Sequence, residues 1–68
     1  MPSGIKIGKK LKVARVGSLL TQEELADKAE VSAGTIVKIE RDQVDPHFST
    51  IRKLARALGV DPSSLLEE

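Results

Sequence analysis

The sequence predicts an all-helical fold of five short helices, and three observations support this fold class. Apolar residues recur three and four positions apart along most of the chain, which is the spacing of one helix face. Residues that begin or end helices stand at the limits of these stretches. No stretch alternates apolar with polar residues and no hairpin dipeptide is present, so strands are not expected. The 68 residues suffice for one small domain, which we expect to span residues 1–68.

The first helix is expected over residues 6–16, with its lysines turned outward. Its inward face is formed by three residues at helical spacing: Ile7, Leu11 and Ala14. Gly17 is expected to end this helix. Leu19 and Leu20 are then expected to return to the core.

Two more helices are expected over residues 22–29 and 33–41. Thr21 and Glu24 form a capping box, in which the hydroxyl and the carboxylate each bond a free backbone amide at a helix start. Ser32 is a second start signal. The connection is too short for antiparallel packing, so we expect the two helices to cross steeply. The residues expected to fill the angle between them are Leu25, Ala26, Ala29, Val31, Ile36 and Ile39.

A fourth helix follows, and Gly59 is expected to end it with a left-handed cap. Its apolar stripe has the spacing i, i+3, i+4, i+7 and consists of Ile51, Leu54, Ala55 and Leu58. Asp61 followed by Pro62 predicts the start of a fifth short helix over residues 63–67. Phe48, the single aromatic residue of the chain, is expected to pack in the core, and an exposed placement would instead suggest a self-association surface.

Composition excludes several classes of function. The chain has no cysteine, which removes disulfides, thiol nucleophiles and zinc–thiolate sites, and its single histidine cannot form a metal site alone. No glycine-rich phosphate loop or carboxylate pair matches a reaction template, so we expect no enzyme, no cofactor and no small-molecule substrate. No apolar stretch approaches the roughly 20 residues of a membrane span and no signal peptide is evident, so the expected location is the cytoplasm.

Charge is segregated along the chain, although the formal net charge is only +1. Residues 1–20 carry five basic residues and no acidic ones, whereas residues 21–45 carry seven acidic residues and three basic ones. The N-terminal lysines are either a solvated helix face or a surface that contacts phosphates. Charge by itself leaves both interpretations open.

Two short helices over residues 21–41, joined by a tight turn, have the layout of a helix-turn-helix, whose second helix reads DNA. The chain resembles the Cro and phage-repressor (xenobiotic-response-element) family over roughly residues 6 to 66. The matching positions are Arg15, Thr21-Gln22, Glu23-Glu24-Leu25-Ala26, Val31-Ser32, Ile36, Ile39-Glu40, Pro46, Leu54-Ala55 and Ala57-Leu58-Gly59-Val60. The resemblance implies a compact repressor-like domain that binds specific double-stranded DNA sequences and regulates transcription, as a repressor.

A recognition helix enters the major groove by its N-terminal end, so the outward residues of its first two turns lie near base edges. The candidate base-reading residues are Ser32, Ala33, Gly34, Val37 and Lys38. By the resemblance, Ala33, Gly34 and Lys38 occupy the main base-reading positions of the family. Among the candidates only Lys38 has a long donor, so direct readout is thin and we expect DNA shape to contribute.

Phosphates are best held by free amides at helix N-termini, where the helix dipole adds positive charge. The resemblance implies that Gln22 contacts the DNA backbone at the start of the second helix, beside Thr21, which also serves as a cap. Further phosphate candidates are Thr35, Arg41, Gln43, Lys9 and Lys10.

The resemblance also implies a structural salt bridge between Arg15 and Glu40, which joins the first helix to the end of the third. It further implies a homodimer, with two recognition helices about 34 Å apart in successive major grooves. In relatives the dimer seam lies around the C-terminal helices, which here would use Val60, Leu65 and Leu66.

Two turn positions depart from the family pattern. Glu30, between the second and third helices, and Asp42, after the third, stand where glycine in a left-handed conformation is common. Both put negative charge near a surface meant to face DNA. They support an alternative function, a protein-interaction module or antitoxin-type partner that keeps the fold with weak or no DNA binding. The salt dependence of duplex binding would discriminate between the two functions.

Overall fold

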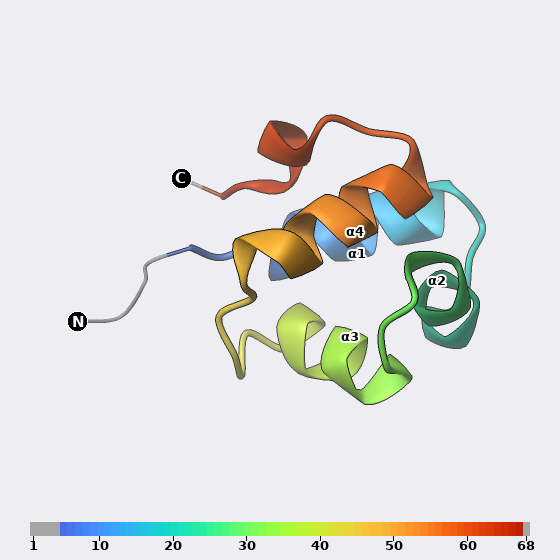
Figure 1. Ribbon diagram of the computed structural model, residues 1–68, viewed down its shortest axis with the longest axis horizontal. Helices are drawn as coiled ribbons and strands as arrows, with labels where there is room; N and C mark the ends of the chain where they lie inside the picture. The colour runs from blue at the N-terminus through green and yellow to red at the C-terminus, as the bar shows by residue number, and fades with distance from the viewer. Residues whose placement is uncertain (1–4, 68) are drawn as a thin grey trace.

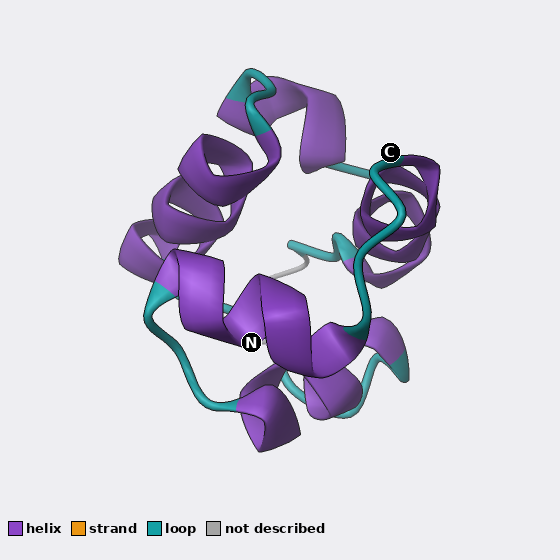
Figure 2. Cartoon of the chain, turned by 90° about the vertical axis from the view of Figure 1, so that its right-hand side faces the viewer, coloured by secondary structure: helices purple, strands orange, loops and turns teal. Residues whose placement is uncertain are grey.

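The computed structural model describes residues 5–67, and all regular structure within them is helical. Helix α1 spans Gly8–Gly17, α2 spans Gln22–Ala29, α3 spans Ala33–Glu40 and α4 spans Phe48–Leu58. A four-residue 3-10 turn, η1, follows at Pro62–Leu65. In Figure 1, α3 lies along the lower edge and η1 along the upper edge, with α4 between them. Figure 2 shows only helices and loops in the described part of the chain.

The predicted all-helical fold is confirmed, but residues 5–67 contain four α-helices and not five. The predicted fifth helix is the short turn η1, in which the Leu66 amide bonds the carbonyl of Ser63, three residues back. Leu66 itself is extended, and the Glu67 amide then donates to the carbonyl of Lys6. The chain leaves the helical path after one turn because its last described residues pair with the segment before α1.

Helix α1 begins at Gly8, later than the predicted start at residue 6. The carbonyl of Lys6 accepts the Glu67 amide at 2.9 Å instead of starting a helix. The N-cap residue Ile7 has no side chain that could cap the helix, and the Glu67 carboxylate accepts from the Lys9 amide at 2.8 Å in its place. The start of α1 is therefore set by a residue at the other end of the chain.

Both start signals of the central helix pair form as the sequence indicates. The Glu24 amide donates to Thr21 Oγ1 at 3.0 Å and the Thr21 amide donates to Glu24 Oε1 at 2.8 Å. At the start of α3 the Thr35 amide donates to Ser32 Oγ at 3.1 Å. Between the helices Glu30 is left-handed, with φ 60° and ψ 43°. This one residue turns the chain so that α3 can cross α2 without a longer loop.

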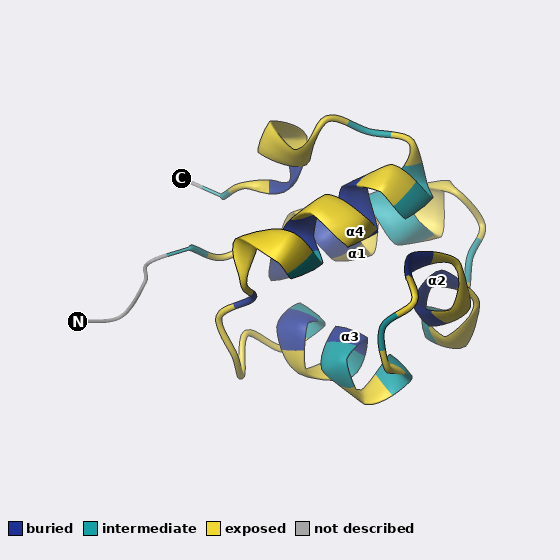
Figure 3. Cartoon of the chain, in the orientation of Figure 1, coloured by how far each residue is buried: buried dark blue, intermediate teal, exposed yellow. Residues whose placement is uncertain are grey.

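The core lies between the helices and draws residues from the whole described chain. Its fully buried large side chains are Ile7, Leu11, Leu25, Ile36, Ile39, Leu54 and Leu65. Each contributes about 1.5–3 kcal/mol by leaving water. Helix α4 packs against α2 and η1, and α1 packs against α3 and η1. The buried faces of the helices turn toward one another in Figure 3. None of the helices within residues 5–67 is long and apolar enough to cross a membrane.

Two residues predicted to lie in the core are on the surface. Leu19 is 89% exposed, because it adopts a left-handed conformation (φ 60°) and its amide bonds the Val16 carbonyl as the chain reverses direction. Leu20 packs against the core, as predicted. Phe48 is 63% exposed, because it is the first residue of α4 and lies one turn before Ile51, the first buried residue of that helix.

Candidate nucleic-acid interface

Helix α3 turns one face into the core and the other toward solvent (Figure 3). Ile36 and Ile39 anchor the inward face and are buried. Ser32, Gly34 and Lys38 lie on the outward face and are exposed. The helix is therefore held from behind while the side that carries the candidate base-reading residues remains open.

The other candidates on α3 lie at the edge between its two faces. Ala33, Thr35 and Val37 are half-buried. The hydroxyls of Ser32 and Thr35 lie 2.7 Å apart and share a hydrogen bond, so they stabilise the helix start as well as face solvent. Ala33 and Val37 present methyl groups, which suit contact with the methyl group of thymine.

Gly34 leaves the outward face of α3 without a side chain in the first turn. A Cβ added there would meet no other atom within 4 Å. The protein itself therefore does not require glycine at this position, and the backbone of α3 is accessible to anything that approaches from outside.

The start of α2 lies beside the end of α3. Gln22 is half-buried, and its Nε2 donates to Glu40 Oε1 at 3.1 Å. Thr21 is exposed and its hydroxyl is occupied by the capping box with Glu24. The first backbone amides of a helix have no partner within the helix, so those of α2 not used by the cap remain available to an anion.

The carboxylate of Glu40 joins three helices. Arg15 Nε lies 2.7 Å from Glu40 Oε2, and Arg15 Nη2 donates to Glu40 Oε1 at 3.1 Å. Arg15 Nη1 also donates to the carbonyl of Leu20 at 2.8 Å. The ion pair implied by the resemblance is thus formed, and with the bond from Gln22 it ties α1 and α2 to the last residue of α3.

The remaining phosphate candidates are exposed and lie away from the leading end of α3. Arg41 and Gln43 follow the helix, and the Gln43 amide bonds the carbonyl of Lys38 at 2.8 Å. Lys9 and Lys10 lie on the first turn of α1, which approaches the last turn of α3. These four residues flank the C-terminal end of α3, whereas the base-reading candidates extend from its N-cap, Ser32, to Lys38 in its last turn.

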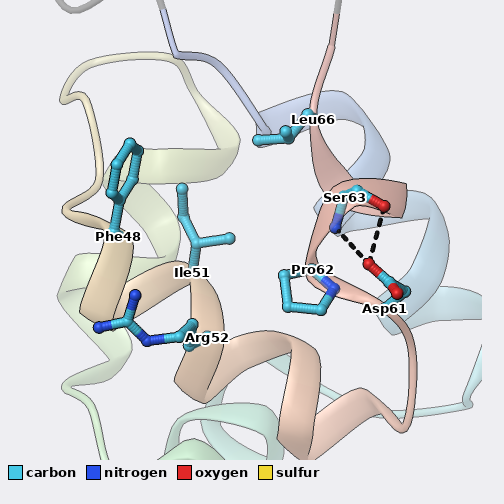
Figure 4. Close-up of a pocket in the computed structure, with 7 residues that line it drawn as sticks. All are labelled: Phe48, Ile51, Arg52, Asp61, Pro62, Ser63 and Leu66. Atoms are coloured by element: carbon cyan, nitrogen blue, oxygen red, sulfur yellow. Dashed lines mark hydrogen bonds between the residues drawn. The ribbon is translucent and has the colours of Figure 1, made fainter.

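A shallow groove lies on the opposite edge of the molecule, between α4 and η1 (Figure 4). It has a volume of about 370 Å³ and is lined by Phe48, Ile51, Arg52, Asp61, Pro62, Ser63 and Leu66. Hydrogen bonds from the hydroxyl and the amide of Ser63 lower the pKa of Asp61 below its usual value. The groove is mostly apolar at its centre, with the exposed Phe48 ring along one side.

The predicted dimer seam needs one correction. Leu65 is 1% exposed and belongs to the core, because η1 folds back over α1 and α4. Val60 is half-buried against the core, and Leu66 is 39% exposed at the edge of the groove. Leu65 is therefore unavailable to a partner, whereas Phe48, predicted to lie in the core, is exposed along the groove.

Sequence reasoning missed two residues that position the helices. Gly8 allows the backbones of α1 and α3 to approach closely, and Glu67 caps α1 from the other end of the chain. A glycine inside a helix with no turn to explain it was a usable signal for the first. No local signal identifies the second.

Comparison with known proteins places this geometry in a family. A profile of the helix-turn-helix family matches residues 11–65. The immunity repressor protein of Bacillus phage phi105 is 39% identical over 62 residues, which cover 91% of this chain and 43% of that protein. The chain therefore spans less than half the length of this relative.

Solved structures share the fold over most of the chain. The restriction-modification controller protein from Aeromonas hydrophila superposes with a TM-score of 0.85 at 32% identity, covering 91% of this chain and 94% of that one. SinR, the master regulator for biofilm formation, solved in complex with DNA, superposes with a TM-score of 0.84 at 30% identity, covering 87% and 95%. With the matched profile and the outward-facing α3, these likenesses show that the chain belongs to the Cro and phage-repressor type of helix-turn-helix family, a family of DNA-binding transcriptional regulators.

Proposed function

We propose that this chain binds specific sequences of double-stranded DNA through α3 and acts as a transcriptional repressor in the cytoplasm. The observation that carries the proposal is the outward face of α3, where Ser32, Gly34 and Lys38 are exposed while the buried Ile36 and Ile39 fix the helix from behind. A rod of this kind fits a major groove by its N-terminal end. SinR, of the same fold, has been solved with DNA bound.

Base reading is assigned to three residues on the outward face of α3 and two at its edge: Ser32, Gly34, Lys38, Ala33 and Val37. Lys38 reaches a guanine edge or a phosphate, and Ala33 and Val37 contact thymine methyl groups. Gly34 lets the helix backbone approach the bases closely. Since one long donor cannot specify an operator, most discrimination comes from methyl contacts and from DNA shape.

Phosphate contacts on both sides of α3 fix its register. The start of α2, with Gln22 and Thr21, holds one phosphate by its amides. Thr35 reaches the backbone from α3, and Arg41 and Gln43 hold it beyond the end of that helix. The lysines of the first turn of α1, Lys9 and Lys10, reinforce the contact.

The DNA-bound form is proposed to be a homodimer that joins through the groove between α4 and η1. Phe48 and Leu66 expose apolar surface at that groove (Figure 4), and α3 lies along the other edge of the molecule (Figure 1). To read two half-sites, the recognition helices of such a dimer must lie about 34 Å apart in successive major grooves.

The competing function is a protein-interaction module that keeps the fold without binding DNA. It is favoured by the net charge of +1 and by Glu30 and Asp42, both exposed in the turns that flank α3. Two acidic groups beside a phosphate backbone weaken attraction to DNA. Because of these two acidic residues, the duplex-binding experiment below is designed to distinguish both functions.

The two functions separate in a duplex-binding experiment. Duplexes that bind the protein are selected from a random pool, and the affinities of the selected duplex and of a scrambled duplex are measured at two salt concentrations. DNA binding predicts a selected consensus with two-fold symmetry and an affinity that falls steeply with salt. Absent or salt-independent binding would reject it in favour of the interaction module.

A matched pair of lysine variants tests the assignment of α3. Lys38→Ala is expected to lose about 1–3 kcal/mol of binding to the selected duplex if the side chain grips a base edge. Lys12→Ala removes the same charge from an exposed position on α1 and serves as the control. Equal losses in both variants would show that Lys38 contributes only its charge.

A further inference from the structure

We infer, resting on the proposed DNA binding, that Gly8 is a positioning residue for the recognition helix, because its missing side chain seats the end of α3 against α1. Gly8 is buried. A Cβ built on it would overlap the carbonyl oxygen of Ile39, and would lie 3.3 Å from that of Glu40 and 2.7 Å from Asp42 Oδ1.

Close approach, and not backbone conformation, explains glycine at this position. Gly8 is the first residue of α1 and does not have the positive φ that excludes other residues. Glycine is less favourable than alanine in helices generally, so helix propensity does not explain its presence here. Gly17, at the other end of the same helix, has no atom within 4 Å of an added Cβ and shows that α1 as a whole is not crowded.

The atoms that an added methyl group would meet cannot easily move away. The carboxylate of Asp42 can rotate about its side-chain bonds, but the carbonyls of Ile39 and Glu40 belong to the last turn of α3. To restore normal contact distances, α3 must shift away from α1 by roughly 0.5–1 Å. Close packing makes the whole helix respond, because no void beside it takes up the shift.

Such a shift acts on DNA reading because α3 is attached to α1 at its C-terminal end. The Gly8 contact and the Arg15 pair with Glu40 both lie at that end. The leading end of α3, which carries Gly34, instead follows the turn from α2, whereas Lys38 lies in the last turn, beside Ile39. Moving one end changes the tilt of α3 relative to the start of α2, where the phosphate is held.

A change of tilt affects specific and general binding differently. Hydrogen bonds and methyl contacts to base edges depend on placement within fractions of an ångström. Attraction of exposed lysines to phosphates depends on charge and tolerates such displacements. Gly8 is therefore required for discrimination between DNA sequences more than for attraction to DNA.

The test compares Gly8→Ala with the matched control Gly17→Ala. Both are made in a Leu19→Gly background, in which a strained turn remote from Gly8 is relieved, so that both remain folded at the assay temperature. The probes are the tightest duplex from the selection described above and a scrambled duplex of the same length. The measured quantity is the ratio of the two affinities, with thermal unfolding recorded for each variant.

Gly8→Ala is expected to lower the affinity for the selected duplex about tenfold, the loss of one good base contact, with the affinity for the scrambled duplex changed less than about threefold. Gly17→Ala is expected to leave the affinities for both duplexes unchanged. Amide NMR signals of residues 36–42 are expected to move in Gly8→Ala and to stay in place in Gly17→Ala.

An unchanged ratio in folded Gly8→Ala, or equal losses for both duplexes, would overturn the positioning role. A variant that fails to fold would overturn it too, because Gly8 would then serve folding only. Failure of the proposed DNA binding is distinguishable, since the parent and Gly17→Ala would then show no preference for the selected duplex.

Discussion

Replacing Glu40 by alanine is expected to destabilise the protein strongly. Its side chain is 4% exposed and that of Arg15 is 11% exposed, so the ion pair is largely removed from water. Alanine at this position would strand the guanidinium of Arg15 and leave Gln22 Nε2 without its acceptor. Removing one partner of a buried pair costs about 3–5 kcal/mol, and because this pair keeps some contact with solvent we expect about 3 kcal/mol.

Thermal unfolding followed by circular dichroism measures the loss. For a domain of this size about 3 kcal/mol lowers Tm by roughly 12–24 °C. Glu23→Ala is the matched control. Glu23 is an exposed carboxylate on α2 and forms no bond with Arg15 or Gln22. It is expected to leave Tm within about 3 °C of the parent.

A double variant separates the net contribution of the ion pair to stability from the cost of leaving one charge unpaired. Arg15→Leu combined with Glu40→Leu leaves no charge unpaired and is expected to be more stable than Glu40→Ala. If the Tm of Glu40→Ala equals that of the parent, Glu40 does not hold the three helices together.

Three further changes test separate parts of the account. Glu30→Gly is expected to raise stability by up to about 1 kcal/mol, because glycine relieves the left-handed strain, and a large loss of Tm would show that the turn has another geometry. Glu67→Ala is expected to cost about 1 kcal/mol and to speed hydrogen exchange of the Lys9 amide, while unchanged exchange would refute the long-range cap. Phe48→Asp is expected to abolish dimerisation in sedimentation experiments without lowering the Tm of the monomer, and Val13→Asp, at another exposed apolar residue, is the control that should still dimerise.

Local signals in the sequence predicted the central part of the fold well. The start of α2 follows from Thr21 and Glu24, and that of α3 follows from Ser32, all within one helical turn of the amides they bond. The left-handed turn at Glu30 came from the family pattern. The two helix starts depend only on neighbouring residues, so a reading of adjacent positions suffices for them.

The errors lie where distant segments meet. Helix α1 starts late and the predicted fifth helix shortens to η1 because Glu67 pairs with Lys6 and Lys9. Hydropathy placed Leu19 and Phe48 inside, but their positions at the end of a turn and the start of a helix carry them beyond the core. Periodicity reports which face of an element is apolar, and it does not report where the core ends.

The candidate site divides in the same way. Periodicity predicted which residues of α3 face outward, since Ile36 and Ile39 fix the helix phase. The ion pair between Arg15 and Glu40, 25 positions apart, came from the family resemblance and not from local pattern. The roles of the outward residues on DNA stay predictions, because no contact within the protein decides them.

The central claim, that the leading end of α3 enters a DNA groove, is tested most directly by NMR titration of the labelled protein with its selected duplex. The account predicts that the largest amide shifts fall at residues 21–24 and 32–38. Shifts confined to α4 and η1, or no shifts in excess duplex, would contradict it.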